Sequence, residues 1–129
     1  MAAIAQEESL MEKYSSIEHC STIELSKDMI RNMGADEGID TLSAISVEDA
    51  ALIDTFSTEV ATYTQGMSKI MTVVQSGRRV TIYATTSKHT SKMVKMVIFT
   101  SDKQSAVMVI LTGTNIELNN ASSIVNINL

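Results

Sequence analysis

The sequence predicts a two-layer α+β fold, in which an antiparallel four-stranded meander in the C-terminal half packs against helices from the N-terminal half. Up to about residue 64, apolar residues recur every three or four positions in the longer segments, which is typical of amphipathic helices. After Gly66 the apolar residues alternate with polar ones, as they do in strands. Short polar turns separate these strand-like runs, and such connections join antiparallel neighbours.

The first expected helix covers residues 7–18. Leu10, Tyr14 and Ile17 fall on one of its faces by their spacing. Glu7 lies in the first turn, where the helix dipole favours an acidic side chain.

A short strand at residues 21–25 and a two-turn helix at residues 27–33 are expected next. Ser26 precedes this helix and has a side chain suited to an N-cap. Gly34 follows it, at the position where a left-handed C-terminal cap is favoured.

A second strand at residues 41–45 leads into the longest expected helix, which ends near residue 64. Ser46 and Asp49 form a capping-box pattern at its start, because an acid three residues after the N-cap can bond back to it. One face of this helix is apolar and contains Leu52, Phe56, Val60 and Tyr63.

The four strands of the meander are expected at residues 69–75, 79–86, 93–100 and 105–112. The last two are apolar on both sides, which is typical of strands buried on both faces. Strands 21–25 and 41–45 could extend the meander or pair with each other. A last short helix is expected at residues 117–125. The whole chain of 129 residues is expected to form one domain, with residues 1–6 flexible.

Several classes of site are disfavoured by the composition. One cysteine and two histidines without metal-ligand spacing argue against a zinc site, and we expect no cofactor and no metal. A net charge of −5 and an aromatic content of 4% argue against nucleic-acid binding. No apolar run is long enough to span a membrane.

Two groups of residues offer weak candidates for a chemical site. His19 and Cys20 are neighbours, but a Cys–His nucleophile pair needs side chains that meet in space, and neighbours on a strand point to opposite faces. Asp36, Glu37 and Asp40 supply oxygen ligands for a hard cation but lack the EF-hand spacing. The expectation is that no residue is catalytic and that the protein is not an enzyme.

The basic residues give the clearest candidate patch. Most acidic residues lie in residues 1–64, whereas in residues 65–129 the basic residues outnumber the acidic ones. Because a meander folds back on itself, its turns gather basic side chains at the two ends of the sheet, where they could bind an anion or an acidic partner. One end would hold Arg78, Arg79 and Lys103, and the other would hold Lys88, His89 and Lys92.

A set of segments, taken in order, also resembles a known family. The segments are TIELSKDMIRNM at residues 22–33, LSAIS at 42–46, VTIY at 80–83, VKMVI at 94–98 and VMVILTG at 107–113. Together they are similar to a family of small Bacteroidetes proteins known as domain of unknown function 4252, over roughly residues 8–125.

This resemblance implies a location rather than an activity. Members of the family usually begin with a secretion signal, often of the lipoprotein type, which implies a periplasmic or cell-envelope location. No such segment is present in this sequence, so a cytoplasmic location is the alternative. The resemblance implies no substrate and no catalytic residues.

The sequence therefore favours a non-enzymatic interaction or structural module of the cell envelope. Its partner would be another protein or a second copy of the chain, as in a homodimer, because the sheet is apolar beyond what three short helices cover. The alternative is a domain that binds a small ligand or an anion, either in a pocket between sheet and helices or at a basic end of the sheet.

Overall fold

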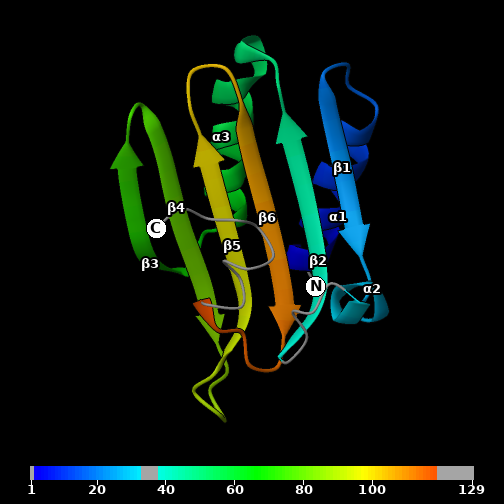
Figure 1. Cartoon of the computed structure of the whole chain (residues 1–129), viewed down its shortest axis with the longest axis vertical. Coiled ribbons are helices and arrows are strands. Elements are labelled where there is room, and N and C mark those ends of the chain that lie inside the picture. The colour runs from blue at the N-terminus through cyan, green and yellow to red at the C-terminus, as the bar shows by residue number, and fades with distance from the viewer. Residues whose placement is uncertain (1, 33–37, 119–129) are drawn as a thin grey trace.

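The structure is a computed structural model that describes residues 2–32 and 38–118, with side chains from residue 7 onward. It confirms the α+β class: a six-stranded antiparallel sheet has helices packed against it (Figure 1). The helical elements are α1 (Ala2–Ser15), α2 (Lys27–Asn32), the 3₁₀ turn η1 (Ala50–Leu52) and α3 (Ile53–Tyr63). The strands are β1 (Cys20–Leu25), β2 (Ile39–Val47), β3 (Ser68–Gln75), β4 (Arg78–Thr86), β5 (Met93–Ser101) and β6 (Ala106–Gly113).

The predicted meander is confirmed, and both N-terminal strands extend it. The strand order is β1-β2-β6-β5-β4-β3, and every neighbouring pair is antiparallel. β2 is longer than the predicted strand 41–45 and pairs with β6, while β1 pairs with β2. The two N-terminal strands therefore both pair with each other and extend the meander. The edges of the sheet are β1 and β3.

The predicted bounds of the first helix, residues 7–18, are wrong at both ends, because α1 runs from Ala2 to Ser15. His19 has a positive φ of 67°, which an α-helix does not allow, and the Cys20 N–H donates to the Ile17 carbonyl to close a turn. This turn reverses the chain so that β1 runs back along the sheet. The second helix starts at Lys27 as predicted and is described as far as Asn32.

The predicted N-cap of the long helix is also wrong. Ser46 still belongs to β2, where it pairs with Ser21 on one side and Val107 on the other. Asp49 is the cap instead, since its Oδ1 accepts a hydrogen bond of 3.0 Å from the Ala51 N–H at the start of η1. Sheet pairing holds the Ser46 backbone in a ladder and moves the helix start downstream.

One face of the sheet, called the helix face below, carries α1 and α3, which lie behind the strands in Figure 1. An aromatic row crosses this layer from α1 to the sheet. The Tyr14 and Phe56 rings lie 4.9 Å apart at 67°, and the Phe56 and Phe99 rings lie 5.8 Å apart at 68°. Edge-to-face contacts of this kind add to the stabilisation from burial. Val97 and Met108 are fully buried in the same cluster.

The other face, called the opposite face below, holds a second apolar cluster, so the central strands are buried on both sides as predicted. Ile82, Met96 and Leu111 are fully buried there. Ile30 of α2 and Ile116 cover one end of this face, and the Ile116 N–H donates to the Met93 carbonyl over 2.8 Å. These contacts occupy the end where β6 finishes and β5 begins.

Some expectations lie outside the described residues. They are the Gly34 cap, the acids Asp36 and Glu37, and all but the first two residues of the helix expected at 117–125.

Candidate ligand-binding groove

A groove of about 490 Å³ lies on the opposite face, at the end away from Ile30 and Ile116. It sits where β3 ends, β4 begins, β5 ends and β6 begins. The register brings these positions together, because Val73 pairs with Val80 and Arg79 pairs with Ser101. Alternation along the strands then points every second side chain toward this face.

The floor of the groove is aliphatic and is contributed by four adjacent strands. Val80, Ile98 and Val109 are buried, with 8%, 2% and 8% of their surface exposed, while Val73 and Val107 are half-buried. The described lining residues with apolar side chains are Val73, Val80, Ile98, Val107 and Val109. Such a floor favours an apolar ligand, since burying apolar surface is the main source of binding free energy.

The rim of the groove is polar and carries two opposite charges. The described polar lining residues are Gln75, Ser76, Arg78, Thr100 and Asp102. Hydrogen bonds to Asp102 Oδ1 from the backbone N–H groups of Gln104, at 2.7 Å, and Ser105, at 2.8 Å, hold the pKa of this carboxyl below its usual range. The Arg78 guanidinium lowers the pKa of Asp102 further. Asp102 is therefore already engaged in its own turn, while Arg78 is exposed.

The structure places the predicted basic residues in two groups at opposite ends of the sheet. Arg78 and Arg79 begin β4 and Lys103 lies in the β5–β6 turn, so these three residues share the end that holds the groove, and Arg78 lines it. The other three, all exposed, lie in the β4–β5 connection: Lys88, His89 and Lys92. Within the described part of the chain, none of the six forms an ion pair.

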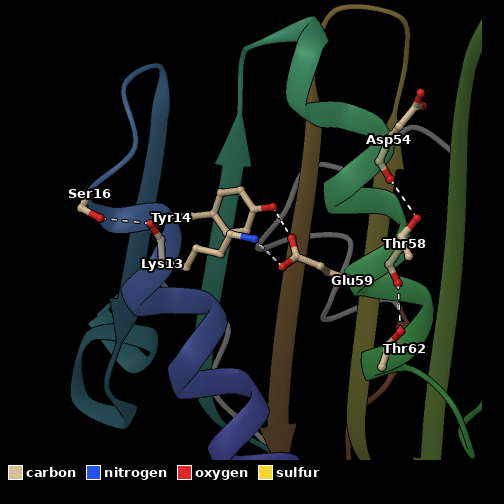
Figure 2. Close-up of polar contacts among 7 residues, drawn as sticks. All are labelled: Lys13, Tyr14, Ser16, Asp54, Thr58, Glu59 and Thr62. Atoms are coloured by element: carbon tan, nitrogen blue, oxygen red, sulfur yellow. Dashed lines mark hydrogen bonds and ion pairs between the residues drawn. The ribbon is translucent and has the colours of Figure 1, made fainter.

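Sequence reasoning missed a pair of contacts that join α1 to α3. The Tyr14 hydroxyl of α1 donates to Glu59 Oε1 of α3, and Lys13 Nζ lies 2.7 Å from Glu59 Oε2 (Figure 2). Burial, followed by the hydrogen bond to Glu59, raises the pKa of Tyr14 well above its usual range. Tyr14 therefore remains a neutral donor.

A second contact runs in the reverse direction. The Tyr63 hydroxyl of α3 donates to Glu7 Oε1 of α1 over 3.1 Å, and Ser43 Oγ donates to Glu7 Oε2 over 3.3 Å. Lys95 Nζ lies 4.5 Å from the centre of the Tyr63 ring. Burial, with the Glu7 charge second, raises the pKa of Tyr63, whereas burial lowers the pKa of Lys95 against the attraction of Glu7.

The two Tyr–Glu contacts are reciprocal, because each helix supplies one tyrosine and one glutamate. The sequence spacing could have indicated these contacts, because it places the tyrosine and the glutamate of each helix on one face. Glu7 and Tyr14 are two turns apart, and Glu59 and Tyr63 are one turn apart. Each carboxylate is satisfied by the neighbouring helix, so these groups hold the helical layer together. The groove on the other side of the sheet is the stronger candidate for binding.

The family comparison agrees with the extent of this fold. Residues 14–124 match the family described as a domain of unknown function (DUF4252). The chain belongs to the DUF4252 family. The matched stretch runs from the end of α1 past β6 and so contains every strand that builds the groove. No curated protein and no solved structure shows significant similarity to the chain.

His19 and Cys20 do not form a nucleophile pair in this DUF4252 domain. His19 Nε2 lies 3.7 Å from Glu18 Oε1, and both side chains are exposed. Cys20 is half-buried at the start of β1, and burial, with the Asp49 charge second, raises the pKa of its thiol. A raised pKa keeps the sulfur protonated, which is the opposite of what a catalytic thiolate needs.

Of the three carboxylates that could bind a cation, only Asp40 lies among the residues that the structure describes. Asp40 Oδ1 lies 3.5 Å from Lys27 Nζ, so its charge is offset by a neighbouring base. Among the residues that the structure describes, no three or more His, Cys, Asp or Glu side chains lie close enough together to hold a metal ion. None of the described helices is long and apolar enough to cross a membrane.

Proposed function

We propose that this DUF4252 domain is a non-enzymatic binding module of the cell envelope, and that its groove binds an amphiphile with one aliphatic chain and an anionic head group. The main support for this proposal is the size and composition of the groove. Its volume of about 490 Å³ lies in the usual range of ligand sites, which is about 300–1,000 Å³. An aliphatic floor with a few polar groups at the mouth is the common composition of such sites.

The charges at the mouth favour an anionic head group over a cationic one. Arg78 lines the groove, and Arg79 and Lys103 lie at the same end of the sheet. Asp102 is the one described acid in the lining, and two backbone N–H groups already bond its carboxylate. A carboxylate or phosphate at the mouth would therefore find an exposed guanidinium, which binds such groups through parallel hydrogen bonds.

Two observations support a role without catalysis. The thiol of Cys20 has a raised pKa and lies on β1, whereas the groove is formed by β3, β4, β5 and β6. The described groove lining contains neither histidine nor cysteine. The hydroxyls of Ser76 and Thr100 lie at the rim, but the described lining holds no histidine to act as their general base.

The envelope location is supported by the resemblance of the segments quoted above to a family whose members usually carry a secretion signal. Its test is fractionation of the source organism with an antibody against this domain. The proposal expects the domain in the periplasmic or membrane fraction. Recovery with the cytoplasmic markers would overturn the location and leave the binding proposal standing.

Binding is tested by thermal unfolding with three probes: sodium decanoate, decanol and sodium sulfate. A ligand that binds only the native state raises the melting temperature. Decanoate is expected to raise it most, because it fills the floor and pairs with Arg78. Decanol is expected to give a smaller rise, and sulfate little or none. A melting temperature unchanged by decanoate would overturn the proposal.

Matched variants separate the floor from the rim. Val107→Phe fills the half-buried part of the floor and should remove the response to both decanoate and decanol. Ile23→Phe adds an aromatic ring on the same face but outside the groove, at a side chain that is 52% exposed, and should leave both responses intact. Arg78→Gln should reduce the response to decanoate alone, with Lys88→Gln at the other end of the sheet as its control.

A further inference from the structure

The strand β3 forms one edge of the sheet and exposes two large aliphatic side chains. Ile70 is 44% exposed and Val74 is 62% exposed. Met71 and Val73 pack against the opposite-face cluster, so the alternating residues Ile70, Thr72 and Val74 point to the helix face. In Figure 1, α1 and α3 lie behind the other strands, and no described helix lies behind β3.

An uncovered strand edge of this composition is unusual for a monomer. The run from Ile70 to Val74 contains no charge and no proline, and its residues favour strands. Such an edge presents unpaired N–H and C=O groups to any other strand, and monomeric proteins normally interrupt it with charges or proline. The other edge, β1, differs because Glu24 lies within it and α1 packs behind it (Figure 1).

We propose that β3 pairs in antiparallel orientation with β3 of a second copy of this chain, about a two-fold axis at Thr72. The sequence of β3 is complementary to itself in this register. Ile70 of one copy lies opposite Val74 of the other, and Met71 lies opposite Val73. Aliphatic and β-branched pairs across two strands stabilise a sheet, and a two-fold interface forms each of these contacts twice.

The charges agree with the same register. Lys69 is the one charged residue of β3, and it lies before the regular part of the strand. The β-bulge of β3 lies between Lys69 and Met71, at the start of the strand, so residues 71–75 are regular. The contact therefore opposes no like charges.

The dimer also extends the face that carries the groove. A two-fold axis perpendicular to the sheet keeps the opposite faces of both copies on the same side. Val73 lines the groove from β3, and Met71 of the second copy would lie directly across from it. The groove would thus gain an apolar wall, although the association itself does not depend on any ligand.

Sedimentation velocity over a concentration series tests the association. The wild-type chain is expected to sediment at twice the chain mass of 14.0 kDa. Thr72→Lys places two ammonium groups opposite each other at the axis and should weaken the dimer at least about tenfold. Thr72 is exposed, so circular dichroism and the monomer's cooperative unfolding should show that the variant folds.

A charge exchange makes the test specific for the register. Thr72→Glu is expected to weaken the dimer as Thr72→Lys does, and an equimolar mixture of the two variants should restore it, because the lysine then faces the glutamate. Ile23→Lys at the other edge is the matched control and should remain dimeric. A wild-type chain that stays monomeric throughout the series would overturn the proposal, as would a dimer that Ile23→Lys dissociates and Thr72→Lys does not.

Discussion

The Tyr14 hydroxyl of α1 donates to Glu59 of α3, while the Tyr63 hydroxyl of α3 donates to Glu7 of α1. The two contacts cross the same interface in opposite directions. A hydrogen bond to a charged group contributes more to stability than a neutral one. The helical layer is therefore fixed by two polar contacts in addition to the aromatic row beneath them.

These contacts predict a loss of stability in alkali. Burial, reinforced by the hydrogen bond and charge of the paired glutamate, raises the pKa of both tyrosines above the ordinary value of 10.0. As the pH rises above 10, the unfolded chain releases the tyrosine protons while the folded chain keeps them, so the free energy of unfolding falls. Below pH 10 the contribution is fully present. Urea unfolding between pH 8 and 11 measures this slope.

The double variant Tyr14→Phe, Tyr63→Phe is the control for the alkaline slope. It should lose about 1.5–3 kcal/mol per hydrogen bond at pH 8, because each bond is made to a charged carboxylate, and then show a flatter dependence above pH 10. Lys95 acts in the opposite sense in both proteins, since its lowered pKa makes stability rise toward the ordinary lysine value of 10.5. An alkaline slope that is identical in the two proteins would contradict the assignment.

The aromatic row predicts a large effect of truncation at its centre. Phe56 is fully buried and contacts the rings of both Tyr14 and Phe99. Phe56→Ala should lower the free energy of unfolding by about 3–5 kcal/mol, because it removes buried apolar surface and leaves a cavity. Phe56→Leu keeps much of the volume and should lose less. Denaturant unfolding gives both values, and a loss below 1 kcal/mol for the alanine variant would contradict the packing described.

Gly113, the last residue of β6, lies so close to the Gly38 backbone that we expect it to tolerate no side chain. A Cβ added to Gly113 would lie 1.9 Å from the Gly38 carbonyl oxygen, which also accepts the N–H groups of Thr114 and Asn115. Gly113→Ala should cost about 1–3 kcal/mol, since the backbone must move apart. Thr114→Ala, at an exposed neighbour, is the control in the same unfolding experiment and should change little.

The corrected helix start gives a direct comparison of two caps. Asp49→Ala removes the hydrogen bond to the Ala51 N–H and should cost about 0.5–2 kcal/mol. Ser46→Ala should cost clearly less, because the Ser46 backbone pairs in the sheet and its side chain caps nothing that the structure describes. A larger loss for Ser46→Ala would restore the cap expected from the sequence.

The periodicity of the chain predicted most of the fold because it depends on local rules. The meander followed from alternation along the strands at 69–75 and 79–86 and from the apolar runs at 93–100 and 105–112, and the short polar turns implied antiparallel neighbours. The pairing of β2 with β6 could not be predicted in this way, since it joins segments about sixty residues apart and no local signal fixes the register. The Ser46 cap failed for the same reason, because a tertiary strand pairing replaced a local preference.

The candidate site was predictable only in part. The sequence placed Arg78, Arg79 and Lys103 at one end of the sheet, and the register confirms this placement. The groove itself lies on the face away from α1 and α3 rather than between sheet and helices. Ile30 and Ile116 cover one end of the opposite face, and the groove lies at the end that they leave uncovered. Alternation along a strand does not show which end is covered.

The most direct test of the account is a titration of the methyl-labelled protein with sodium decanoate, followed by nuclear magnetic resonance. The groove predicts shifts confined to the methyl groups of Val73, Val80, Ile98, Val107 and Val109, with the helix-face methyl groups of Val97 and Ile110 unaffected. Arg78→Gln should weaken these shifts without moving them elsewhere. Shifts centred on the helix face, or no shifts at any concentration below micelle formation, would contradict the account.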